Sequence, residues 1–281
     1  MKTPKRIEPL VQDGLVDEVI RQLMSGKEAS VYVVRCGEEI RCAKVYKEAI
    51  KRSFRQSTDY TEGRKVKNSR RARAMEKGTK YGRKAQEESW QNTEVDTLYR
   101  LAAAGVRVPK PYNFHEGVLL MDLVTDSNDN AAPRLNDLVL NAELSREYHR
   151  ILVTQVVRML CAGIIHGDLS EYNVLVDSTG PIIIDLPQAI DAAANNQACK
   201  MLLRDVENLA IYFGQFAPEL LTTSYGMEIW SLYQSGQLYP ESILTGYFEC
   251  IEQSVNIKSV LREINDTLKE EEARKLYRTL R

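Results

Sequence analysis

The sequence lacks a long hydrophobic run. None of its 281 residues belongs to an apolar stretch of about 18 residues or more, the length that a transmembrane helix needs. The first residues, MKTPKRIEPLVQDG, also lack the apolar core of a secretory signal peptide. These two absences lead us to expect a cytoplasmic protein that does not enter a membrane.

The sequence also has little of the chemistry that binds zinc or builds disulfide frameworks. It contains five cysteines, an odd number, without a C-x-x-C pair, and three histidines without an H-E-x-x-H motif. Zinc sites and disulfide-rich domains depend on such spacings, so their absence argues against both. With 43% hydrophobic and 27% charged residues, the composition is typical of an ordinary globular protein.

Positive and negative charges nearly balance over the whole chain, but they are unevenly distributed along it. The formal net charge is −1. However, Lys47 to Glu88 holds 14 basic and six acidic residues, a net charge of +8, so the rest of the chain carries −9. This segment has few large apolar residues, and we expect it to form a mobile loop that can contain transient helix. Clustered Lys and Arg neutralise phosphates, so RNA or a ribosomal precursor is a candidate partner; a solvated loop without a partner is the alternative.

The first part of the chain predicts a β-rich lobe with one long helix. Runs rich in β-branched and aromatic residues predict an antiparallel sheet, because a turn-forming C-G-E-E sequence separates two of them. The expected strands are Val19 to Met24, Ser30 to Arg35, Ile40 to Tyr46 and Val118 to Val124. Apolar residues at helical spacing predict a helix from Ala85 to Ala104 that ends at Gly105.

The second part of the chain predicts mainly helices. Its expected helices are 144–160, 199–216, 227–232, 240–255 and 259–281, and its expected short strands are 174–176 and 182–184. The fold class is therefore α+β, with a β-rich first lobe and a helical second lobe. We place the boundary in the loop Thr125 to Ala132, which gives an N-lobe of residues 1–124 and a C-lobe of residues 125–281.

The most informative motif is His166 to Asn173, H-G-D-L-S-E-Y-N, which fits H-x-D-x-x-x-x-N. Asp185 follows twelve residues later, directly after an apolar run. Phosphoryl transfer needs a carboxylate that orients the attacking hydroxyl and oxygen ligands that hold Mg²⁺ against a triphosphate. Asp168, Asn173 and Asp185 supply these groups, whereas a chance match in a polar turn is the alternative interpretation.

Two upstream features complete this hypothesis. The loop from Ser25 to Tyr32, S-G-K-E-A-S-V-Y, lies between two expected strands, where backbone N–H groups can bind phosphates, although it is neither a Walker loop nor G-x-G-x-x-G. Lys44 is a single cation in the third apolar strand, and Glu94 lies on the following helix. A strand lysine paired with a helix glutamate orients ATP phosphates in kinase-like folds. Each feature alone also fits a plain hairpin turn or a solvent-facing lysine.

These motifs together resemble the RIO family of atypical serine/threonine protein kinases. The family signatures S-T-G-K-E-A-x-V-Y, H-x-D-L-S-E-[YF]-N and I-I-D-x-x-Q-[AS] correspond here to Met24–Tyr32, His166–Asn173 and Ile183–Ala189, with M-S in place of S-T. The resemblance covers about 200 residues, from Gly14 to Phe213. Within the family, the chain most resembles the subgroup without an N-terminal winged helix. A bacterial-type member of that subgroup is one of the expected identities.

The resemblance implies a kinase-like two-lobe fold that lacks the usual activation loop and peptide-binding subdomains. It implies ATP and Mg²⁺ as cofactors, with Mn²⁺ as a second candidate metal. The implied roles are catalysis by Asp168 and Asp185, metal binding by Asn173 and Asp185, and an acceptor role for Asp185 through an aspartyl-phosphate. The implied nucleotide contacts are Ser25, Gly26, Lys27, Glu28, Ala29, Ser30, Val31, Lys44, Glu94, Met121, Asp122 and Val124. Asp205 resembles a helix aspartate that braces the catalytic loop, while an exposed helix acid is the alternative.

Three functions follow as hypotheses. The preferred one is an ATP-dependent protein kinase that phosphorylates a protein or itself, or that acts largely as an ATPase. A small-alcohol phosphotransferase of the aminoglycoside or choline type is the second, because its catalytic loop resembles H-G-D-L-x-x-x-N. An ATP-switched ribosome-assembly factor that binds RNA through residues 47–88 is the third.

Overall fold

The computed structural model describes residues 3–26, 28–47 and 80–249 of the chain, and it describes side chains throughout these ranges except for residues 80–90. Residues 48–79 of the basic segment, Lys27, and the expected helix from residue 259 onward therefore lie outside the described residues.

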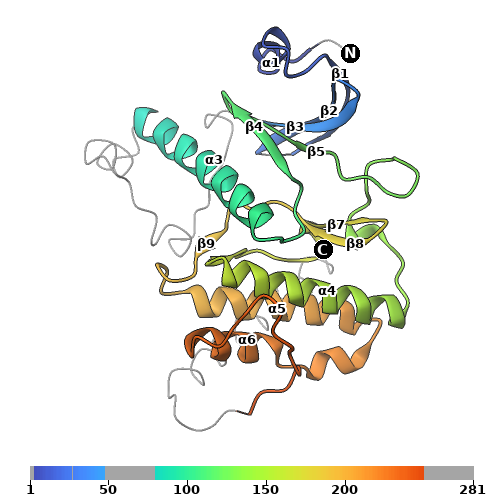
Figure 1. Ribbon diagram of the computed structural model, residues 1–281, viewed down its shortest axis with the longest axis vertical. Coiled ribbons are helices and arrows are strands. Elements are labelled where there is room, and N and C mark those ends of the chain that lie inside the picture. The colour runs from blue at the N-terminus through green and yellow to red at the C-terminus, as the bar shows by residue number, and fades with distance from the viewer. Residues whose placement is uncertain (1–2, 27, 48–79, 250–281) are drawn as a thin grey trace, which may run out of the picture.

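A five-stranded antiparallel sheet forms the first lobe (Figure 1). Its strand order is β1-β2-β3-β5-β4. The strands are β1 (Glu18–Ser25), β2 (Ala29–Cys36), β3 (Glu39–Tyr46), β4 (Pro111–His115) and β5 (Val118–Asp122). The predicted antiparallel start of three strands is confirmed, and Gly37 takes the positive φ of 66° that its tight β2–β3 turn requires.

The edge of this sheet differs from the prediction. We expected one strand from Val118 to Val124, but β5 ends at Asp122, and β4 was not expected at all. Prolines disfavour central strands because proline donates no hydrogen bond to a ladder. Pro111 is tolerated because it is the first residue of β4, which is an edge strand.

The two faces of the sheet have different roles. The short helix α1 (Glu8–Gln12) covers one face, where Ile7 and Leu10 pack in a cluster with Ala43 and Val45 of β3. Because side chains alternate along a strand, Lys44 and Tyr46 lie on the opposite face, towards helix α3 and the second lobe. This alternation directs Lys44 away from the apolar cluster.

Helix α3 runs from Lys80 to Ala103. It begins five residues before the predicted start, so the expectation of a loop is wrong for residues 80–84, and residues 85–88, which both expectations covered, follow the helix prediction. Lys, Arg, Glu, Gln and Ala all favour helices, and this explains why a charged segment without a core can continue one. The predicted glycine terminator is confirmed: Gly105 has φ +73°, and Val106 N–H donates to the carbonyl oxygen of Leu101.

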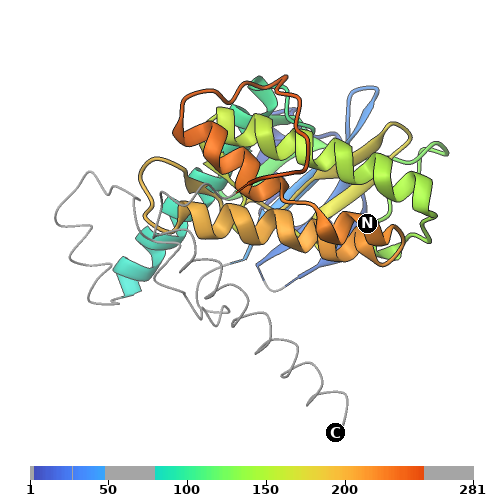
Figure 2. The ribbon, with the colours of Figure 1, turned by 90° about the horizontal axis from the view of Figure 1, so that it is seen from below.

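The second lobe is mainly helical, and α4, α5 and α6 lie side by side in it (Figure 2). They span α4 (Ala142–Cys161), α5 (Ala198–Gly214) and α6 (Tyr225–Gln234). Two small two-stranded antiparallel sheets lie between these helices and the sheet of the first lobe. One pairs β6 (Ile164–Ile165) with β9 (Ile190–Asp191), and the other is the hairpin of β7 (Val174–Asp177) and β8 (Gly180–Ile183). The predicted α+β class, with a β-rich and a helical lobe, is confirmed.

The predicted helix over 240–255 is wrong for its described part, because residues 240–249 are not helical. Gly246 has φ +72°, and the carboxylate of Glu228 on α6 accepts hydrogen bonds from the N–H groups of Thr245 and Gly246. These tertiary contacts compete with helix formation. Among the described helices, none is long and apolar enough to cross a bilayer.

Candidate active site

Lys44 connects the two lobes. Its Nζ lies 2.5 Å from Oε1 of Glu94 on α3 and 3.2 Å from Oδ1 of Asp185, which follows β8. Burial by itself lowers the pKa of a lysine, but the two carboxylates outweigh it, so the pKa of Lys44 lies well above its usual value. Lys44 is therefore a largely buried cation that keeps its charge, positioned to bind an anion between the lobes.

Tyr46 holds the second oxygen of the same glutamate. Its hydroxyl donates to Oε2 of Glu94 at 2.7 Å, and its ring packs edge-on against Phe114 of β4. Burial, the largest influence, and the neighbouring Glu94 raise the pKa of Tyr46 well above its usual value despite the Lys44 charge, so the hydroxyl remains a donor. Glu94 is thus fixed by one group at each oxygen.

The loop from His166 to Asn173 leaves the side chain of Asp168 exposed. The short 3-10 helix η4 (Glu171–Asn173) returns the chain so that Nδ2 of Asn173 donates to the carbonyl oxygen of Asp168 at 2.8 Å. Nε2 of Gln188, from the segment after Asp185, donates to Oδ2 of Asp168 at 3.4 Å. The Asp168 carboxylate is exposed and oriented by a neighbour, as a group that accepts a proton from a substrate hydroxyl needs to be.

Asp205 on α5 braces this loop from below. It is only 2% exposed, and its two oxygens accept the N–H groups of Gly167 at 2.8 Å and Leu169 at 3.0 Å. Burial raises the pKa of Asp205 to about 7, although both hydrogen bonds act in the opposite direction. Asn208, one turn further along α5, donates to the carbonyl oxygen of Leu169. The geometry favours the bracing interpretation over the exposed-acid alternative.

His166 joins the catalytic loop to Asp185. Its Nε2 donates to the carbonyl oxygen of Ile184 at 3.1 Å, while its Nδ1 accepts from the N–H of Asp168 at 3.3 Å. Burial lowers the pKa of this histidine, which matches a neutral ring with the proton on Nε2. One neutral side chain therefore fixes the spacing of the two aspartates.

Asp185 has a strained backbone and an ionised side chain. Its φ of +66° is unusual for a residue other than glycine, and such conformations concentrate at functional sites. Desolvation raises the pKa of Asp185, but the Lys44 ammonium, its hydrogen bond and other nearby cations lower it by more, so the net shift is downward. The side chain remains 50% exposed to the cleft.

The β1–β2 loop lies at the mouth of the cleft. The N–H of Gly26 donates to the carbonyl oxygen of Ala29, and the hydroxyls of Ser25 and Ser30 lie 3.1 Å apart. Nζ of Lys47 donates to Ser25 Oγ at 3.0 Å and to the carbonyl oxygen of Gly26 at 2.5 Å. Glu28 and Val31 complete the described part of this loop, while the predicted contact Lys27 lies outside it.

The segment that links the two lobes, Met121 to Val124, has backbone groups that can hydrogen-bond to an adenine ring. Met121 and Asp122 end β5, and Asp122 is tethered by the hydroxyl of Tyr112 at 2.6 Å and the N–H of Lys110 at 3.1 Å. Val124 is buried, and its N–H makes no hydrogen bond to the residues that the structure describes. A buried backbone donor is nearly always paired in a working protein, so this N–H fits the predicted contact with a purine nitrogen.

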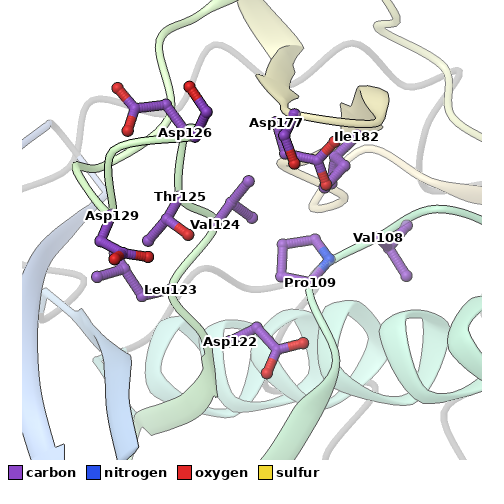
Figure 3. A pocket seen from close by; sticks show the side chains of 12 residues that line it. Val108, Pro109, Asp122, Leu123, Val124, Thr125, Asp126, Asp129, Asp177 and Ile182 are labelled. Atoms are coloured by element: carbon purple, nitrogen blue, oxygen red, sulfur yellow. The ribbon is translucent and has the colours of Figure 1, made fainter.

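A pocket of about 420 Å³ lies beside the same link (Figure 3). Val108 and Pro109 line it together with four carboxylates, which belong to Asp122, Asp126, Asp129 and Asp177. Asp122 and Val124, the expected adenine contacts, also line it, whereas Lys44, Glu94, Asp168, Asn173 and Asp185 do not. Its four carboxylates would repel a triphosphate, so this pocket does not suit the phosphates of a nucleotide.

The donor set in the cleft fits Mg²⁺. Among the described residues, no group of three or more His, Cys, Asp or Glu side chains is arranged to hold a metal. Mg²⁺ does not require one, since it commonly takes one or two protein oxygens and completes its shell with phosphates and water. Asp185 supplies an ionised carboxylate, and Asn173, whose NH₂ donates to Asp168, keeps its amide oxygen for a ligand.

The structure brings Lys44, Glu94, Asp168, Asn173 and Asp185 to one cleft. Sequence reasoning missed Tyr46, Gln188, Lys47 and the linking role of His166. A signal existed for Tyr46, because it lies two residues after Lys44 and therefore on the same face of the strand. No sequence signal indicated that Lys47 would contact the β1–β2 loop.

An antiparallel sheet that carries a lysine–glutamate ion pair, above a helical lobe that carries an H-x-D loop braced by Asp205, defines a protein-kinase-like fold. Comparison with known proteins narrows this class. The RIO domain family matches residues 30–225. The chain belongs to the RIO family, in the group of RIO1-type serine/threonine-protein kinases.

Individual relatives show how far the similarity extends. The RIO-type serine/threonine-protein kinase Rio1 of Haloferax volcanii is 36% identical over 214 residues, which cover 74% of this chain and 67% of that protein. The human serine/threonine-protein kinase RIO1 is 28% identical over 211 residues, 74% of this chain but only 35% of the human protein. A crystal structure described as the kinase domain of PF14_0431 covers 89% of this chain and 84% of its own, at 14% identity and a TM-score of 0.47.

Proposed function

We propose that this chain uses ATP and Mg²⁺ to transfer the γ-phosphate to a serine or threonine of a protein or of itself, and that it also hydrolyses ATP. The contact of Lys44 with both Glu94 and Asp185 carries the proposal, because it places a buried cation beside an ionised metal-binding carboxylate. The relatives, which are named as serine/threonine kinases, support it.

In this proposal the two lobes divide the nucleotide between them. The main chain of Asp122 and Val124 contacts adenine, with Met121 beside it. Lys44 binds phosphate oxygens, and Glu94 keeps its ammonium in place. The loop Ser25–Val31 covers the phosphates and donates backbone N–H groups. The lobe boundary at residue 124 follows from this arrangement.

Asn173 and Asp185 would hold the metal. When bound, Mg²⁺ neutralises phosphate charge and orients the transferred group, and Mn²⁺ takes the same oxygen ligands. The lowered pKa of Asp185 keeps that ligand ionised near neutral pH. Asn173 also contacts the carbonyl oxygen of Asp168, so the metal ligand and the catalytic group are fixed relative to each other.

Asp168 supplies the proton acceptor. As the substrate oxygen forms a bond to the γ-phosphorus, the bond from phosphorus to the oxygen of ADP breaks, and the hydroxyl proton passes to the Asp168 carboxylate. The amide of Gln188 orients this carboxylate, and His166 fixes its backbone. The exposure of Asp168 allows a substrate hydroxyl to reach it.

ATP hydrolysis can proceed through Asp185. A carboxylate oxygen of Asp185 attacks the γ-phosphorus, ADP leaves, and water then cleaves the aspartyl-phosphate to release phosphate and restore the carboxylate. The half-exposed and ionised state of this side chain supports a nucleophilic role.

A labelling experiment tests the proposal. Purified protein is incubated with γ-labelled ATP and Mg²⁺, and the label on protein is then exposed to acid or to hydroxylamine. Acid-stable label indicates phosphoserine or phosphothreonine, and hydroxylamine-labile label indicates Asp185. Asp168→Asn and Asp185→Asn should each lower the rate at least about a hundredfold.

The control for this experiment is Asp96→Asn, the same chemical change at an exposed position on α3. It should leave the rate unchanged. Full activity in both Asp168→Asn and Asp185→Asn would refute the site assignment.

The other hypotheses have less support. The relatives described above are named as protein kinases, so a small-alcohol phosphotransferase is not proposed. RNA or ribosomal-precursor binding through residues 47–88 stays a prediction, because residues 48–79 lie outside the described residues. A cytoplasmic location also stays a prediction.

A further inference from the structure

Arg134 contacts both lobes. It belongs to the segment that enters the C-lobe after the link between lobes, and its backbone forms an isolated β-bridge with Leu175 of β7. The neighbouring Pro133 accepts a hydrogen bond from Val176 N–H. Two backbone contacts therefore hold the base of this side chain on the hairpin that begins directly after the catalytic loop.

The guanidinium of Arg134 extends to the opposite lobe. Its Nη2 lies 3.8 Å from Sδ of Met24, on the end of β1 and directly before the phosphate-loop residues Ser25 and Gly26. In Figure 1, β1 belongs to the sheet and β7 lies below it, next to the helical lobe. Arg134 thus spans the cleft at the position where the loop over the phosphates begins.

The side-chain partner of Arg134, the thioether of Met24, does not neutralise its positive charge. A guanidinium carries five N–H donors, and a thioether is a weak, uncharged acceptor. Arg35, Arg41, Arg107 and Arg146 each pair with a carboxylate. Arg134 has no such pair with any residue in the part of the chain that the structure describes.

Two positive charges, on Lys44 and Arg134, lie near the Asp185 carboxylate. Arg134 is one of the cations whose charge acts on Asp185, with Lys44 as the dominant one. Lys44 contacts Asp185 from the sheet of the first lobe, whereas the backbone of Arg134 is attached to β7 of the second lobe. The two cations therefore face the space between the phosphate loop and the metal-binding carboxylate from different lobes.

We propose that Arg134 is a nucleotide-binding residue whose guanidinium donates hydrogen bonds to phosphate oxygens of the bound nucleotide. The inference rests on the proposed function, because it requires a nucleotide in this cleft. A planar guanidinium matches the geometry of phosphate oxygens and can bind two of them at once. Adenine and ribose are uncharged, so neither complements a guanidinium cation as a phosphate does.

Affinities for a series of nucleosides test this assignment. Dissociation constants for ATP, ADP, AMP and adenosine are measured by calorimetry, with Mg²⁺ present, for the wild-type protein and for Arg134→Ala. A hydrogen bond to a charged group predicts that ATP binding weakens about tenfold to a hundredfold, while adenosine binding is unchanged. Arg134→Lys should recover part of the loss, since it keeps the charge but not the planar pair of donors.

The control variant is Arg146→Ala, which removes an arginine that pairs with Glu219 on the surface of the C-lobe. It should bind all four ligands as the wild type does. Arg134→Gln keeps most of the side-chain length and replaces Arg134→Ala if that variant unfolds.

The outcomes separate the inference from the function on which it rests. Equal weakening of ATP and adenosine by Arg134→Ala would assign Arg134 to the ribose or to the fold and overturn the phosphate contact. Unchanged ATP affinity would also overturn it. If the wild-type protein binds none of the four ligands, the proposed function itself fails.

Discussion

Each lobe buries one carboxylate next to the candidate chemistry, and the two are held in different ways. Glu94 in the N-lobe is 6% exposed and is bound by two side chains, Lys44 and Tyr46. Asp205 in the C-lobe is 2% exposed, and it accepts hydrogen bonds from the backbone N–H groups of Gly167 and Leu169. One carboxylate thus positions a charge, and the other positions a loop.

This difference predicts different responses to mutation. Removing a charge partner leaves Glu94 uncompensated in a poorly solvated site, so the penalty is electrostatic. Removing the acceptor of two backbone N–H groups alters the shape of the catalytic loop, so the penalty is geometric and depends on the protonation of Asp205. The following changes test this contrast, beginning with the largest expected effect.

Lys44→Met should have the largest effect. It removes the cation that contacts Glu94 and Asp185, and we expect the rate of phosphoryl transfer to fall roughly a hundredfold to a thousandfold. The buried Glu94 loses its partner, so the free energy of unfolding should fall by about 3 to 5 kcal/mol. Steady-state kinetics and urea denaturation measure the two effects.

The double variant Lys44→Met with Glu94→Gln is the matched control. Because it removes both members of the pair, it should regain much of the lost stability but none of the lost activity. Stability in the double variant as low as in Lys44→Met alone would show that the loss is not electrostatic.

Asp205→Asn should change how stability depends on pH. The pKa of Asp205 is about 7 in the folded protein and about 3.9 in an unfolded chain, so the folded state holds the proton more tightly. The associated stability is fully present below about pH 4 and is lost as the pH rises to about 7, by up to about 4 kcal/mol. Asn cannot titrate, so the variant should lack this decline.

Urea denaturation of both proteins between about pH 4.5 and pH 8 measures this difference. The two pH slopes are compared, because Asn also presents a donor to one backbone N–H and lowers stability at every pH. Parallel slopes for wild type and variant would contradict the raised pKa of Asp205.

Tyr46→Phe should have a moderate effect. It removes only the hydroxyl that donates to Glu94, so unfolding should become easier by about 1 kcal/mol. Because Glu94 keeps Lys44 in place, we also expect the KM for ATP to rise about threefold to tenfold.

Tyr212→Phe is its matched control. The Tyr212 hydroxyl makes a buried hydrogen bond of 2.8 Å to the carbonyl oxygen of Leu135 in the C-lobe. This variant should lose similar stability with the KM for ATP unchanged. A KM change of equal size in both variants would reduce Tyr46 to a purely structural residue.

Removing the exposed ion pair between Glu18 and Arg35 should have the smallest effect. Their side chains are 57% and 47% exposed, and water and salt screen their interaction. Replacing both by alanine should change the free energy of unfolding by less than about 0.5 kcal/mol and leave activity intact. A loss of unfolding free energy as large as that of Lys44→Met would show that burial does not explain the difference between the Lys44–Glu94 pair and this exposed pair.

The sequence was sufficient for the residues whose chemistry depends on local spacing. Asp168 and Asn173 lie five residues apart in one loop, and Asp185 follows a strand that apolar residues identify. Strands β1 to β3 and helices α4 to α6 were predicted because alternation and helical periodicity are local signals. These features need no information from distant parts of the chain.

Residues whose role depends on a distant partner could not be found in this way. Tyr46 and Glu94 are 48 positions apart, and Arg134 and Met24 are 110 positions apart. An aromatic residue on a strand usually indicates core, and an arginine in a loop usually indicates surface. The error over 240–249 has the same origin, since Glu228 on α6 binds the backbone there.

The sequence by itself determined the fold class, the family resemblance and the candidate carboxylates, because these depend on residue type and on spacing along a few turns or strands. The tertiary structure alone decided which side chains form ion pairs, which carboxylates are buried and which arginine contacts both lobes. Burial and Coulomb interactions depend on distance in space, and folding sets those distances by packing elements that lie far apart in the chain.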